Sequence, residues 1–150
     1  MKSLFKRGRS QVKKRLIYVL FFCLMLSGCG TKYTDGTYEA KSSLYEGDPS
    51  QDIPGGDYGI VRICIENGRF VDCAYEMYDP EGALKGSEYG KGADEDLYLI
   101  AQRSVQAGQR YAEQFIETQS LDGVDAISGA TTAYTQFIEA AEQALSEAGS

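Results

Sequence analysis

The sequence predicts a small α+β domain, in which a twisted antiparallel sheet packs against two helices. Two segments near the middle of the chain alternate apolar and polar residues, as half-buried strands do. Two later segments repeat their apolar residues at helical spacing. A run of strands followed by helices favours this fold class, and 150 residues leave room for a single domain.

Turn-forming residues separate the predicted elements, and the sequence contains no internal repeat. The domain is expected to begin at residue 35, after a short tether over residues 29–34. In chain order the predicted elements are a first strand (35–40), a loop (43–57), a hairpin (58–65 and 70–78), a glycine-rich connection (79–92) and two helices (94–118 and 132–147).

Both predicted helices carry an apolar stripe, which we assign to the core rather than to a ligand. The stripe of the first helix starts at Leu97 and Ile100 and continues through Tyr111 to Phe115. The stripe of the last helix comprises Tyr134, Phe137, Ile138, Ala141 and Leu145.

The first 28 residues resemble an export signal rather than a part of the fold. Seven Lys and Arg residues precede an apolar run over residues 16–26, which is short for a membrane span and typical of a signal-peptide core. The run ends in LSGC, which resembles a bacterial lipobox and implies cleavage before Cys29 and lipidation of its thiol. An uncleaved membrane anchor is the alternative. In both cases we expect a domain anchored at the extracytoplasmic face of the cell membrane.

Cleavage would make the protein strongly acidic. The full sequence has 15 basic and 22 acidic residues, whereas the part after residue 28 keeps only 8 of the basic ones and all of the acidic ones. This balance argues against nucleic acid as a partner. The acidic surface either attracts cationic partners and metal ions or serves only to keep the protein soluble.

The sequence contains no His and no CxxC pair, which excludes haem attachment, thiolate zinc sites and His-based catalysis. Cys64 and Cys73 flank the predicted Asn-Gly turn of the hairpin. A simple register pairs Cys64 with Val71 and Cys73 with Arg62, so that the two thiols share a face but lie diagonally. We expect two free thiols packed against the core, with a bridged hairpin as the alternative.

Residues 125–132, DAISGATT, come directly before the last predicted helix. As a polar string they fit a loop and a helix N-cap. They also resemble the Asp-x-x-Ser/Thr-Gly-Ala-Thr/Ser acceptor motif of the FMN-binding domain family, which includes the flavin-carrying subunits of Rnf and sodium-pumping NADH:quinone reductase complexes. Residues 35–38, DGTY, also resemble the start of such a domain. The resemblance implies an FMN-binding domain over residues 35–150.

In that family a flavin transferase esterifies the FMN phosphate to the hydroxyl of the last motif residue, which here is Thr131. A helix N-terminus suits a phosphate, because its free N–H groups and its dipole attract an anion. Gly129 lets the backbone come close to a bulky group. The resemblance implies that Asp125 belongs to the sequence that the transferase recognises; an N-cap or turn carboxylate is the alternative. The other motif residues expected at the site are Ser128, Ala130 and Thr132.

Aromatic and basic residues near the motif are candidates for contact with the flavin ring. Tyr78, Tyr89 and Tyr134 offer flat faces for stacking. Lys91 is a candidate to pair with the phosphate or with the N1–C2=O edge of the ring. Exposed tyrosines and a solvated lysine are the alternatives.

The resemblance implies an electron carrier rather than a self-contained enzyme, with covalent FMN as its cofactor. Electrons would come from a redox donor in the membrane and pass to another exported protein or to a terminal acceptor. The sequence shows no acid–base set that indicates a catalytic pocket, and no metal site. The alternatives are a flavin-dependent reductase of ferric iron or another small acceptor, and a flavin-free envelope lipoprotein that binds a ligand.

Overall fold

The computed structural model describes residues 32–51, 54–92 and 94–150. The predicted signal peptide and the lipidation site at Cys29 lie outside these residues. Within them, no helix is both long enough and apolar enough to cross a membrane.

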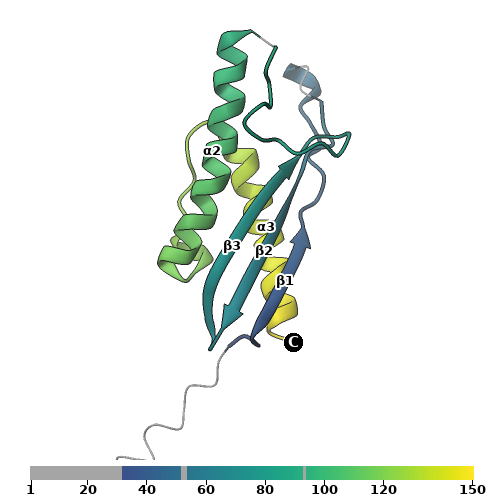
Figure 1. Ribbon diagram of the computed structural model, residues 1–150. Coiled ribbons are helices and arrows are strands. Elements are labelled where there is room, and N and C mark those ends of the chain that lie inside the picture. Colours follow the sequence, from purple (N-terminus) through teal and green to yellow (C-terminus); the bar gives the residue numbers. More distant parts are fainter. Residues whose placement is uncertain (1–31, 52–53, 93) are drawn as a thin grey trace, which may run out of the picture. The chain divides into compact units, whose positions relative to one another are not determined.

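Three antiparallel strands and two long helices form an α+β unit, as the sequence predicts (Figure 1). Helix α2 lies along β3, and α3 runs behind β2 and β1. The elements are β1 (Gly36–Lys41), the 3-10 turn η1 (Pro49–Gln51), β2 (Tyr58–Glu66), β3 (Arg69–Tyr78), α2 (Glu95–Thr118), the 3-10 turn η2 (Leu121–Gly123) and α3 (Thr131–Ala148).

The core lies between the sheet and the helices. Alternation along β2 turns Val61, Ile63 and Ile65 towards the helices, where they are fully buried. Phe115 of α2 and Phe137 of α3 meet these side chains and are themselves fully buried. Small residues on the buried side of α3 let its backbone approach the sheet closely; they are Ala133, Ala140, Ala141, Ala144 and Ala148.

The predicted cross-strand partners of Cys64 and Cys73 are wrong, because β3 contains a bulge. The register shifts between Cys64 and Ile65, so that Val71 is an extra residue without a direct partner. Cys64 therefore pairs with Asp72, and Cys73 pairs with Ile63. The two cysteines project from opposite faces of the sheet, and both thiols are free. Only Cys73 packs against the core.

The prediction that Leu97 and Ile100, at the start of α2, belong to the core is also wrong. The buried residues of this helix begin at Ala107, and its first three turns extend past the core. Leu97 and Ile100 are 59% and 56% exposed. The helix is well formed there nonetheless, since the Asp94 side chain caps it by accepting from the N–H of Asp96 at 3.0 Å.

Asp35, which directly precedes β1, stabilises the turn of the β2–β3 hairpin. Asn67 and Gly68 have φ of 52° and 70°, which fits the expected two-residue turn. The N–H groups of Asn67 and Gly68 donate to the Asp35 carboxylate at 2.9 and 3.0 Å. These two bonds, that from Gly68 first, lower the pKa of Asp35.

We predict that Asp35→Asn destabilises the protein at neutral pH but not in strong acid. A carboxylate with a lowered folded-state pKa stabilises the fold above its unfolded-state pKa, and this contribution is lost as the pH falls through the folded-state value. Urea unfolding of the two proteins at pH 7 and at about pH 2 measures the difference. An equal difference at both pH values would contradict this origin.

Candidate functional site

The motif segment is fixed to the core by the hydroxyl of Tyr111. This side chain of α2 is fully buried. Its oxygen accepts from the N–H of Ile127 at 3.1 Å and donates to the carbonyl oxygen of Ala130 at 3.2 Å. Burial raises the pKa of Tyr111, so the hydroxyl keeps its proton and can donate. A single side chain therefore binds both ends of the segment that leads into α3.

The motif ends on the first turn of α3, with its hydroxyls exposed. Thr131 is the first residue of the helix and Thr132 the second, and both side chains are exposed. The N-cap is Ala130, which makes no side-chain capping bond. Gly129 has a φ of 81°, and a Cβ there would meet open space. The first N–H groups of the helix are thus not covered by a side-chain cap.

The remaining motif positions differ in exposure. Asp125 and Ser128 are exposed, and Ala130 is buried. The N–H of Asp125 donates to the Gln114 side chain at 2.7 Å, which ties the start of the motif to α2. The Asp125 carboxylate faces solvent, where an enzyme that recognises this segment could reach it.

A cavity of about 700 Å³, which we call the motif cavity, begins at Thr131. Its size lies within the range of ordinary ligand pockets. The exposed Leu97 and Ile100 of α2 form one wall, so the part of the helix that extends past the core faces this cavity. The other lining residues are Tyr45, Asp57, Met77, Lys85, Tyr89, Ala101, Ser104, Gly129, Ala130, Thr132, Ala133 and Gln136.

The motif cavity contains one ion pair. Lys85 Nζ lies 2.7 Å from Asp57 Oδ2, and the two side chains are only 12% and 25% exposed. The same Nζ lies 4.8 Å from the centre of the Tyr89 ring. Sequence reasoning missed Lys85, because its burial depends on the fold of the connection between β3 and α2.

Residues 86–89 of that connection are tied to α2. Gln102 donates to the carbonyl oxygens of Gly86 and Tyr89 at 3.2 and 2.9 Å. Tyr98 donates to the carbonyl oxygen of Ser87 at 3.1 Å. These bonds hold Tyr89 on the wall of the motif cavity.

Of the four residues predicted to contact a flavin ring, only Tyr89 lines the motif cavity. Tyr78 projects from the outer face of β3 and stacks on Tyr58, because the neighbouring Met77 takes the inward position. Tyr134 packs edge-on against Tyr111, with ring centres 5.5 Å apart. Lys91 pairs with the exposed carboxylate of Glu88. Tyr78, Tyr134 and Lys91 therefore lie outside the lining of the motif cavity.

Thr131 also lines a smaller cavity of about 350 Å³. Tyr45, Thr132 and Gln136 line both cavities. The smaller one has acidic walls at Glu46 and Glu139, and no Lys or Arg lines it within the described residues. The motif cavity is the larger of these two cavities, and unlike the smaller one it is lined by a lysine, Lys85.

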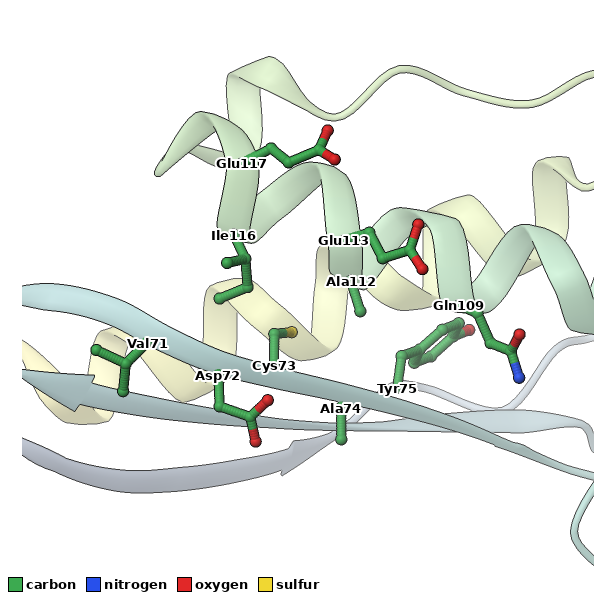
Figure 2. Close-up of a pocket in the computed structure, with 10 residues that line it drawn as sticks. All are labelled: Val71, Asp72, Cys73, Ala74, Tyr75, Gln109, Ala112, Glu113, Ile116 and Glu117. Carbon is green, nitrogen blue, oxygen red and sulfur yellow. The ribbon is translucent and has the colours of Figure 1, made fainter.

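Another cavity, of about 620 Å³, opens between β3 and α2 (Figure 2). Cys73 and Tyr75 project from the strand towards Ala112 and Ile116 of the helix, while Asp72 projects the other way. Burial, and then the charge of Asp72, raise the pKa of the Cys73 thiol to about 12. A thiol in this state is a poor nucleophile and behaves as a packing residue.

Comparisons with known proteins support the fold. No model of a known protein family matches the sequence, and no curated protein matches it. A crystal structure of a protein from Clostridium perfringens is 23% identical, covers 77% of this chain and 88% of its own, and has a TM-score of 0.53. A solution NMR structure of a Clostridium thermocellum protein is 20% identical, covers 77% and 92%, and has a TM-score of 0.46. Both were structural-genomics targets. At 23% identity the first likeness shows a shared fold.

We predict that Tyr111→Phe loosens the motif segment and lowers the free energy of unfolding by about 1–3 kcal/mol. The change leaves the part-buried N–H of Ile127 without its acceptor, and the Ala130 carbonyl keeps only its helical bond from the N–H of Tyr134. Urea unfolding measures the loss, and amide hydrogen exchange at residues 127–131 localises it.

Tyr134→Phe is the matched control, because it removes the hydroxyl of a neighbouring ring and leaves both bonds of Tyr111 in place. Faster exchange at residues 127–131 in both variants would contradict a specific role of Tyr111.

Proposed function

We propose that this protein is an exported, lipid-anchored electron carrier whose FMN is attached through a phosphoester to Thr131. One observation carries the proposal: Thr131, whose hydroxyl the acceptor motif identifies, lines a cavity that is also lined by the exposed apolar side chains of Leu97 and Ile100. The cavity adds to the motif, because residues 129–132 form only one part of its wall and the rest comes from other segments.

The residues around Thr131 fit a phosphate. The first turn of α3 offers N–H groups that no capping side chain covers, and the positive end of the helix dipole favours an anion. Open space beside Gly129 leaves room for the phosphate and the ribityl chain. The exposed Thr131 side chain is accessible to a transferase.

The residues of the motif cavity fit a flat aromatic ring. Leu97 and Ile100 leave more than half of their surface in water, although large apolar side chains gain about 25 cal/mol for each Å² that is buried. Tyr45 and Tyr89 add aromatic surface on other sides of the space. A ring held here would cover the apolar wall of α2.

The attachment requires only a hydroxyl from this chain. Thr131 Oγ1 forms a bond to the phosphorus of an activated flavin nucleotide on the transferase. The bond from that phosphorus to its leaving group breaks, and the hydroxyl proton passes to solvent. The net addition to the protein is FMN less one water.

Bound FMN would supply the redox chemistry by accepting and releasing electrons. The chain itself binds and orients. Within the described residues, the only Asp and Lys on the cavity wall are paired with each other, and no His is present in the sequence. This lining favours a carrier over an enzyme with a general acid and base. It would take electrons from a membrane donor and deliver them to an exported partner or a terminal acceptor.

We predict that Thr131→Ala abolishes flavin attachment. Coexpression with a flavin transferase, followed by mass spectrometry of the intact protein and of its peptides, should give FMN less one water on the wild type. Thr131→Ser should keep the modification, because Ser also supplies a hydroxyl at that position.

Thr132→Ala is the matched control, since the neighbouring hydroxyl lies on the same turn and lines the same cavity. Loss of flavin in Thr132→Ala but not in Thr131→Ala would move the acceptor site. An unmodified wild type in its native host would contradict the carrier and favour a flavin-free binding lipoprotein.

We predict that the reduced flavoprotein reacts with soluble ferric complexes at a rate that rises linearly with their concentration, because a carrier meets such complexes only in collisions and does not bind them first. Stopped-flow absorbance of the flavin measures the rate, with reduced free FMN as the control. A rate that saturates in the flavoprotein alone would favour the reductase.

A further inference from the structure

Lys85 is the one basic side chain on the wall of the motif cavity. The eight Lys and Arg residues after residue 28 all belong to the part of the chain that the structure describes, and the other seven lie outside this lining. The backbone of Lys85 is fixed, because its N–H donates to the carbonyl oxygen of Met77 at the end of β3, at 2.8 Å. The point on the backbone from which this side chain extends is therefore set by the sheet.

The ammonium group of Lys85 is oriented from two sides. Asp57 accepts from it at 2.7 Å, and the Tyr89 ring lies 4.8 Å away. An ammonium has three N–H donors, so these two contacts leave capacity for a partner in the cavity. A lysine that is only 12% exposed and already oriented gives up little freedom when it binds such a partner.

Asp57 is in turn fixed to the helix that begins at Thr131. Its carbonyl oxygen accepts from the N–H of Tyr45 at 2.7 Å and from Nε2 of Gln136 at 2.9 Å. Gln136 is buried and lies five residues after Thr131 on α3. The acceptor hydroxyl and the ammonium thus belong to one connected set of contacts.

We propose that Lys85 binds the N1–C2=O edge of the flavin ring and favours its reduced form, with Asp57 as its positioning residue. This inference rests on the proposed attachment at Thr131. Two electrons and one proton, taken from the redox donor and from solvent, leave one additional negative charge on the ring. An N–H donor that carries a positive charge stabilises that charge more than it stabilises the neutral oxidised ring.

The phosphate is the competing partner for this ammonium, and the ring is favoured. The phosphate is covalently fixed on the first turn of α3, which supplies N–H donors of its own. Lys85 instead packs against Tyr89, an aromatic side chain on the wall that we assign to the ring.

The experiment uses the full chain after flavin attachment, and measures the midpoint potential of the flavin at pH 7 by spectroelectrochemistry. The main variant is the double change Lys85→Met with Asp57→Asn. It removes both charges together and so leaves no unpaired carboxylate in the cavity. We expect the equilibrium between reduced and oxidised ring to fall about tenfold, which is about 30 mV for a two-electron couple.

Two single variants complete the series. Lys85→Arg keeps a cation, so its midpoint potential should stay close to that of the wild type. Lys91→Met removes an exposed lysine that pairs with Glu88 outside the cavity, and should leave the potential unchanged. Urea unfolding of each loaded variant shows whether the fold is intact.

Each outcome separates the two proposals. A wild type without flavin overturns the attachment and this inference together. A flavin on Thr131 whose potential is the same in the wild type and the double variant overturns the role of Lys85 alone. A double variant that loads less flavin but has an unchanged potential would assign Lys85 to the phosphate, and this result would also overturn its role at the ring.

Discussion

The candidate site depends on the two hydrogen bonds that the Tyr111 hydroxyl makes. It lies at the centre of the core, against Phe137 and Tyr134, and it binds the backbone at Ile127 and Ala130. The segment between these two residues is a turn, which the N–H of Ala130 closes by donating to the carbonyl oxygen of Ile127 at 3.0 Å, and Tyr111 ties both ends of this turn to the core. This side chain thereby anchors the backbone one residue before Thr131, where α3 begins.

The length of α2 is the second constraint. Packing against the sheet needs only the half that begins at Ala107. The earlier turns carry Leu97 and Ile100 past the core, where they face the start of α3 across the motif cavity. The connection from β3 follows this part of the helix and brings Lys85 and Tyr89 to the same space. Loop segments from both ends of the hairpin thus meet beside Thr131, although they are far apart in the sequence.

The elements were predictable from the sequence, because strand alternation, helical spacing and the Asn-Gly turn are local signals. The placement of Thr131 on the first turn of a helix was predictable for the same reason. The bulge at Val71 was not, since nothing in a regular alternation marks an extra residue, and it reversed the face of Cys73. Spacing also could not separate Leu97 from the core residues of α2, because a helix continues its stripe beyond the surface that it covers. The sequence suggests Lys91 as the cation for the phosphate or the ring edge, whereas the fold of the connection brings Lys85 to the motif cavity beside Asp57.

The most direct measurement is the nuclear Overhauser spectrum of the flavin-loaded protein, with the methyl groups of Leu97 and Ile100 assigned. A phosphoester at Thr131 with the ring in the motif cavity predicts cross-peaks between the ring protons of FMN and these methyl groups, together with shifts of the Tyr89 signals. A loaded protein whose ring protons contact neither Leu97 nor Ile100 would contradict the cavity as the ring site. A protein that acquires no flavin from a transferase would contradict the function itself.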